Sequence, residues 1–113
     1  MQFTDWETRF EERLRRNDKL PPSHDISHIK RVVENAKRIA LKEGANLGVV
    51  LPSAWLHDLV TLEKNDPARW KASTLAAVEA IRFLEEVHYG QGSLEEIHHC
   101  IVAHSFKIGR AHV

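Results

Sequence analysis

Residues 48–62 read GVVLPSAWLHDLVTL and are apolar on most sides of the helix that they would form. A surface helix carries one apolar stripe, whereas a helix that is apolar nearly all round belongs in the interior. This stretch therefore predicts a central helix against which other helices pack. The same stretch contains an adjacent ionisable pair, His57 and Asp58, close to its end.

Four amphipathic segments accompany the central one. Helices are predicted over residues 4–16, 25–43, 67–87 and 93–104, because apolar residues recur in each at the spacing of one helix face. The four sets are Trp6, Phe10 and Leu14; Ile29, Val32, Val33, Ala36, Ile39 and Ala40; Leu75, Val78, Ile81, Leu84 and Val87; and Leu94, Ile97, Cys100 and Ile101. No stretch sustains the two-residue period of a strand. The expected fold is all-α, a bundle of about five helices.

Residues with special backbone preferences mark where these helices should begin and end. Pro21 and Pro22 would end the first helix, because proline lacks a donor and disfavours helix in the residue before it. Gly44 suits the C-terminal cap of the second helix. Pro67 would open the fourth helix within its first turn, and Ser93 is a suitable N-cap for the fifth. The fourth helix is expected to end at residues 90–92, which read GQG.

Composition bounds the class of protein. The chain has 113 residues, 42% of them hydrophobic and 28% charged, which is typical of one soluble globular domain. Sixteen basic residues balance sixteen acidic ones, so nucleic-acid polymers are not expected as partners. No apolar run approaches the roughly 18 residues of a membrane span, and the N-terminus does not resemble a targeting signal. A single cysteine, Cys100, suits a reducing compartment, so a cytoplasmic location is expected.

The last seven residues do not continue the helical pattern. Residues 107–113 read KIGRAHV, and an in-frame reading of the start of a common sequencing adapter encodes residues 108–113. We therefore expect residues 107–113 to be adapter read-through rather than native sequence, the alternative being a coincidental short tail. Without Lys107 and Arg110 the basic residues fall from 16 to 14 against 16 acidic ones, a net charge of −2.

The His57–Asp58 pair is the strongest candidate for a functional site. Packing of the apolar helix would bury both side chains, which is costly unless something binds them. Imidazole nitrogen and carboxylate oxygen together suit a divalent ion, and the residue types do not distinguish Mn, Mg, Fe, Co, Ni and Zn. His28, in the first turns of the second helix, is the best candidate for a further ligand, with Asp25 or a backbone group placed to orient it.

Plainer interpretations exist for each histidine. A His-Asp dipeptide is frequently a buried hydrogen-bonded pair or a structural metal site without catalysis. His98 and His99 point in different directions on one helix, so at most one of them faces the core. His104 continues the apolar stripe of the last helix, as a core residue or a site residue. Cys100, in mid-helix, is interpreted as a small core residue rather than a nucleophile.

Three segments in this order resemble the HD-domain metal-dependent phosphohydrolases. Residues 23–32 read SHDISHIKRV, residues 54–60 read AWLHDLV, and residues 103–106 read AHSF. The resemblance covers about residues 6–106. It implies that residues 1–106 are the N-terminal part of an HD domain, an all-α bundle.

By this resemblance His28, His57 and Asp58 are three of the four protein ligands of the family's H, HD, D pattern. The fourth ligand, an Asp on a helix beyond the AHS segment, has no counterpart here: Asp66 precedes the fourth helix, and no residue after Phe106 is acidic. The resemblance therefore implies a fragment that is inactive by itself.

The implied activity is metal-dependent hydrolysis of a phosphate ester or anhydride, with a small phosphorylated substrate such as a nucleotide. Asp58 would act as the catalytic residue as well as a ligand. Lys64, Arg69 and His104 would bind the phosphate oxygens of the substrate, although a solvated loop explains the first two equally well. The alternative function is a non-catalytic helical module that binds a metal or a partner; self-association into an oligomer is compatible with either.

Overall fold

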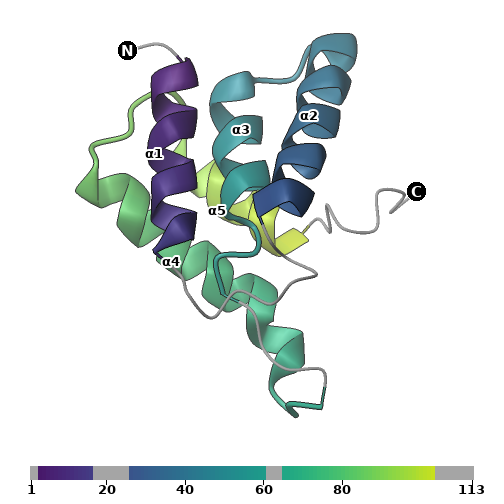
Figure 1. Ribbon diagram of the computed structural model, residues 1–113, viewed down its shortest axis with the longest axis vertical. Coiled ribbons are helices and arrows are strands. Elements are labelled where there is room, and N and C mark those ends of the chain that lie inside the picture. The colour runs from purple at the N-terminus through teal and green to yellow at the C-terminus, as the bar shows by residue number, and fades with distance from the viewer. Residues whose placement is uncertain (1–2, 17–25, 61–64, 104–113) are drawn as a thin grey trace.

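The computed structural model describes residues 3–16, 26–60 and 65–103, without the side chain of Arg69. These residues form five α-helices and no strand, which confirms the all-α expectation (Figure 1). The helices are α1 (Phe3–Arg15), α2 (Ile26–Glu43), α3 (Leu47–Leu56), α4 (Ala72–Glu86) and α5 (Leu94–Ala103), and the short 3₁₀ helix η2 (Arg69–Lys71) precedes α4. The expected adapter-derived tail, residues 107–113, lies outside the described residues.

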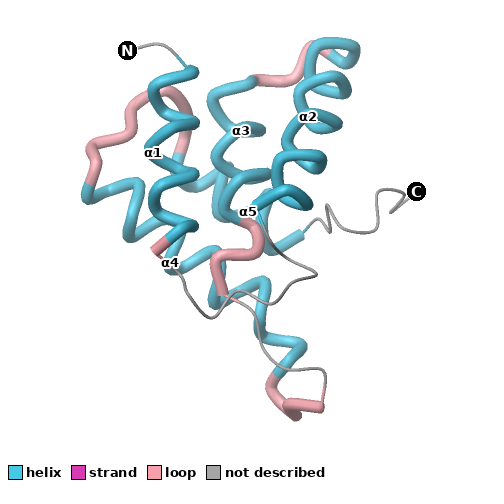
Figure 2. The backbone as a smooth tube through the Cα atoms, viewed as in Figure 1, coloured by secondary structure: helices cyan, strands magenta, loops and turns pink. Residues whose placement is uncertain are grey.

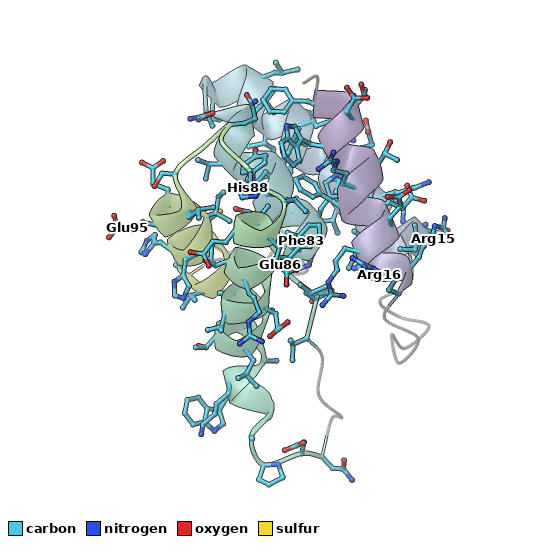
Figure 3. The ribbon with its side chains drawn as sticks, turned by 90° about the vertical axis from the view of Figure 1, so that its left-hand side faces the viewer. Arg15, Arg16, Phe83, Glu86, His88 and Glu95 are labelled. Atoms are coloured by element: carbon cyan, nitrogen blue, oxygen red, sulfur yellow. The ribbon has the colours of Figure 1, made fainter. Side chains whose placement is uncertain are left out.

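The helices form two layers with α3 in the middle. In Figure 1, α1, α3 and α2 stand side by side, while α4 and α5 lie behind them; Figure 3, turned by 90°, separates the two layers. Helix α3 packs against all four other α-helices. Its residues are buried on most sides, and Leu51, Ala54, Trp55 and Leu56 are all at most 4% exposed. The described part of this apolar run, residues 48–60, therefore forms the centre of the fold, as its composition predicts.

Amphipathic spacing identified most of the core. Trp6, Phe10 and Leu14 of α1 are all buried, as expected. On α4 the expectation fails at Leu75 and Val78, which are 41% and 45% exposed, because Ala76, Ala77, Ala80 and Phe83 form the buried face together with Leu84. On α2 it fails at Ile39, which is 60% exposed although it follows the apolar spacing. A single stripe of α2 is enough to cover α3, so an apolar residue at the edge of that stripe remains in solvent.

Helix α3 is shorter than predicted. It ends at Leu56 rather than Leu62, so His57 is its C-cap. In a longer helix the carbonyl oxygen of Ala54 would accept the N–H of residue 58, but here it accepts from Nδ1 of His57 at 2.7 Å. A side chain that takes a backbone acceptor in this way competes with helix continuation.

Helix α4 begins later than predicted. The carboxylate of Asp66 accepts from the N–H of Ala68 at 2.8 Å, which holds Pro67 in a turn. The 3₁₀ helix η2 follows, and α4 begins only at Ala72. The expectation that Pro67 opens the fourth helix is therefore wrong, because the side chain before the proline stabilises a turn instead.

The helix caps follow the expected chemistry in two places of three. Gly44 ends α2 with a φ of +73°, and the Ser93 hydroxyl accepts from the N–H of Glu96 at 3.2 Å in the first turn of α5. Helix α4 ends before residues 90–92, because His88 takes the left-handed position with a φ of 56°. The N–H of Tyr89 then reaches the carbonyl oxygen of Leu84 at 2.9 Å, closing a Schellman motif.

The loop between α4 and α5 packs closely against the first turn of α3. Pro52 lies inside α3 and has no N–H, so the carbonyl oxygen of Gly48, four residues earlier, loses its helical donor. The buried hydroxyl of Tyr89 donates to this oxygen instead. The backbone of Gln91 lies so close that a Cβ built on Gly48 would stand 1.8 Å from its carbonyl oxygen. This contact requires glycine at position 48.

We expect Gly48→Ala to destabilise the fold by about 1–3 kcal/mol, because the new methyl group overlaps the Gln91 backbone. Alanine is otherwise the better helix former, so the sign of the change isolates the steric effect. Urea unfolding checks the prediction. Gly90→Ala is the matched control, since a Cβ there meets nothing within 4 Å. Equal stability of the two variants would contradict the close contact.

We expect the free energy of unfolding to fall as the pH rises from about 10 to about 12. Burial raises the pKa of Tyr89 from 10.0 to about 12, so the folded chain retains a proton that the unfolded chain releases. The stabilisation is complete below pH 10 and is lost through pH 12. Tyr89 is the only tyrosine, so near-ultraviolet tyrosinate absorbance reports on it alone. Titration of Tyr89 at its ordinary pKa would contradict this prediction. The Tyr89→Phe variant should not show the fall in the free energy of unfolding between about pH 10 and pH 12 that Tyr89 causes.

Candidate functional site

His57 and Asp58 occupy the turn that follows α3, shown as a loop in Figure 2. The two residues are only 7% and 2% exposed, in agreement with the expectation that the apolar helix carries them into the interior. A buried carboxylate beside a buried imidazole is stable only when both groups are bonded. His57 bonds the carbonyl oxygen of Ala54 through Nδ1, and Asp58 also has an interaction partner, so both side chains are held in place.

The hydrogen bond to Ala54 defines the chemical role of each nitrogen of His57. A carbonyl oxygen can only accept, so Nδ1, at 2.7 Å from the Ala54 oxygen, carries a proton. In the neutral ring Nε2 is then the atom with the lone pair, which is the usual arrangement of a metal-binding imidazole. Sequence patterning did not reveal this orienting bond, because it depends on where α3 ends.

The carboxylate of Asp58 faces that nitrogen. Nε2 of His57 and Oδ2 of Asp58 lie 3.3 Å apart. Two ligand atoms bound at about 2.1 Å to one ion are about 3.0 Å apart at a right angle and about 3.4 Å apart at a tetrahedral angle. The pair thus presents two electron-pair donors at the separation that a shared cation requires. By donor type and spacing, these two side chains suit a divalent metal ion.

His28 lies on the helix that packs against α3. It belongs to the first turn of α2 and is half-buried, and α2 and α3 contact each other extensively. Figure 1 shows the start of α2 and the end of α3 at the same end of the front layer. Even so, within residues 3–16, 26–60 and 65–103 no three His, Cys, Asp or Glu side chains are grouped closely enough to hold one ion. The structure therefore joins His57 with Asp58 but does not complete a three-ligand group with His28.

The residues expected to bind substrate are described only in part. Lys64 and His104, like the proposed orienting residue Asp25, lie outside the described residues. Arg69 lies in η2, just before α4, and its side chain is not described.

The other candidates behave as the plainer interpretations suggest. His98 is half-buried and His99 is exposed, so only one of the two turns inward. Burial raises the pKa of the Cys100 thiol, and its interaction with the Ser53 hydroxyl lowers it in part. A thiol with a raised pKa is a poor nucleophile at neutral pH, which supports the assignment of Cys100 to packing. Ser53 itself is fully buried and donates to the carbonyl oxygen of Val49 at 2.7 Å, a role that the sequence did not indicate.

A groove of about 520 Å³ lies between α1 and α4, away from the His57–Asp58 pair. It is lined by Arg9, Glu12, Arg15, Arg16, Phe83 and Val87, and Figure 3 labels three of these residues. Its positive charge is partly compensated, because Arg15 bonds Glu11 at 2.6 Å. Neither His57 nor Asp58 contributes to its lining, so the groove is not a substrate pocket of that pair.

No protein-family model, curated protein or solved structure matches the chain.

None of the helices among the described residues is both long and apolar enough to cross a membrane.

We expect His57 to carry its proton on Nδ1 whenever its ring is neutral, because the Ala54 carbonyl oxygen fixes that tautomer. Long-range ¹⁵N–¹H NMR spectra at a pH where the rings are neutral distinguish the two tautomers. His99, which is exposed, serves as an internal reference without this constraint. A neutral His57 protonated on Nε2 would contradict the orientation and remove the lone pair from the side of Asp58.

Proposed function

We propose that this chain is the N-terminal part of a metal-dependent phosphohydrolase of the HD type, which hydrolyses a phosphate ester or anhydride. The observation that supports this most is the buried His57–Asp58 pair, with Nε2 and Oδ2 3.3 Å apart and Nδ1 already bonded to Ala54. The order of the SHDISHIKRV, AWLHDLV and AHSF segments supports it independently. A nucleotide is the substrate that we favour within this class.

In this proposal His57 and Asp58 would hold the ion, and His28 would join them once the remaining ligands are present. A metal ion bound there would supply Lewis acidity, with which a water molecule would be activated and the phosphoryl oxygen polarised. Ala54 keeps the imidazole in the tautomer that presents Nε2. Asp58 would also orient the attacking water and accept its proton. Lys64, Arg69 and His104 are proposed to bind the phosphate oxygens.

A second candidate is a non-catalytic helical module. It is favoured by the absence, among the described residues, of a group of three or more side chains that could hold a metal. In that case the His57–Asp58 pair would stabilise the end of α3 without chemistry.

Metal binding tests the assignment of His57 and Asp58 as metal ligands in the 113-residue chain itself. We expect Mn²⁺, Co²⁺ or Zn²⁺ to raise its thermal midpoint, because binding to the folded state alone adds about 2.7 kcal/mol at a metal concentration one hundred times the dissociation constant. His57→Gln and Asp58→Asn should abolish the shift, and His99→Gln, on an exposed histidine, should retain it. Circular dichroism without metal establishes that each variant folds.

A metal-induced shift that survives His57→Gln and Asp58→Asn would show that the site has been assigned to the wrong residues. No shift with any of the ions would show that the pair does not hold a metal in this chain, and the activity of the whole protein then decides between the two candidates. For the whole protein encoded by the source gene, we expect Mn²⁺-dependent hydrolysis of nucleoside triphosphates, lost in His57→Ala and in Asp58→Ala.

A further inference from the structure

The face of α4 that points away from the core carries apolar residues. Ala76, Ala80 and Leu84 on the inner face are fully buried. On the opposite face Leu75 and Val78 are 41% and 45% exposed. Burial in the bundle explains the inner residues but not these two.

These two residues belong to a continuous stripe. Lys71, Leu75, Val78, Arg82 and Glu85 follow one another at intervals of four, three, four and three residues. At 3.6 residues per turn they fall within about 80° of one another on the helix surface. We call this set the outer stripe. Its spacing is that of a helix–helix seam, with two apolar residues in the middle and charged residues at both ends.

The outer stripe is complementary to itself in the antiparallel direction. If a second α4 lies antiparallel, with the two-fold axis at Val78, then Val78 faces Val78, and Leu75 lies beside Arg82 of the second copy. Lys71 then faces Glu85 at each end. A parallel pair would instead place Lys71 against Lys71 and Glu85 against Glu85, which is repulsive.

The charged groups of the stripe are suited to these contacts. In the described part of the chain Glu85 has no ion pair of its own, so its carboxylate is available to a lysine from outside. The ammonium of Lys71 lies 5.2 Å from the ring centroid of Trp70, which is 77% exposed and extends the apolar surface beside the stripe. Arg82 already bonds Glu79 at 3.3 Å, so its charge is compensated.

The beginning of α4 is also accessible. In both Figure 1 and Figure 3 it extends beyond the other helices, so a second copy can approach it without meeting α1, α2 or α3.

We propose that α4 is a self-association surface, on which a second copy of this chain packs antiparallel through the outer stripe about a two-fold axis at Val78. An isologous contact of this kind uses the same residues on both copies and closes after two. One helix face buries less than the roughly 800 Å² per partner of a standard interface, so the dimer is weak and depends on concentration. This inference does not rest on the proposed hydrolase function.

Sedimentation velocity over a concentration series tests the proposal on the 113-residue chain. We expect a monomer–dimer equilibrium that Leu75→Glu abolishes. Leu41→Glu is the matched control, because Leu41 is an exposed leucine on α2, at 74% exposure, and should leave the dimer intact. A chain that stays monomeric up to its solubility limit, or a dimer that responds equally to both substitutions or to neither, would overturn the proposal.

A charge exchange tests the direction of packing. Lys71→Glu and Glu85→Lys should each weaken the dimer about tenfold, because the two-fold axis makes each repulsive pair occur twice. The double variant should restore the affinity of the original chain. Lys42→Glu and Glu95→Lys make the same charge changes on exposed parts of α2 and α5, and should have little effect. Failure of the double variant to restore the dimer would overturn the antiparallel register.

Discussion

Burial of α3 on nearly every side is the constraint on which the rest of the structure depends. Helix α3 has ten residues and contacts the four other α-helices. Little room is left around it for unpaired polar backbone groups or for side chains at its closest contacts. Each irregularity of α3 is therefore matched by a specific partner. Because Pro52 has no N–H, the Gly48 carbonyl oxygen lacks its helical donor, and the Tyr89 hydroxyl donates to it instead. The small size of Gly48 allows the α4–α5 loop to approach closely enough for this bond. The two-layer arrangement follows from the need to bury this one central helix on nearly every side.

The same burial gives the His57–Asp58 pair its chemical character. The helix carries two ionisable side chains into a region where neither is stable alone, and the Ala54 carbonyl oxygen then fixes the orientation of the imidazole. What results is a nitrogen lone pair and a carboxylate oxygen at the spacing of ligands to one cation. Catalysis needs more than two ligands, and the described residues do not group a third with them. The hydrolase proposal therefore depends on side chains from elsewhere joining this pair.

The inner and outer faces of α4 differ in what they contact. Its inner face contributes alanine, phenylalanine and leucine to the core, whereas of the apolar residues predicted for this helix only Leu84 is fully buried. Its outer face repeats an apolar centre with charges of opposite sign at the two ends, a pattern that a solvated helix does not require. The beginning of α4 also extends past the rest of the bundle, which leaves the pattern open to a second molecule (Figure 1).

Periodicity in the sequence determined the all-α class, the central position of α3 and most of the core outside α4, because an apolar stripe favours burial of the helix face that carries it. It also placed Gly44 and Ser93 at helix ends and marked His57 and Asp58 as a buried pair. Only the tertiary structure decided where α3 stops, which nitrogen of His57 is protonated and that His28 does not complete a three-ligand group with the pair. These features depend on competition between side-chain and backbone hydrogen bonds and on how helices cross in space. Neither is encoded in the spacing of residues along one helix.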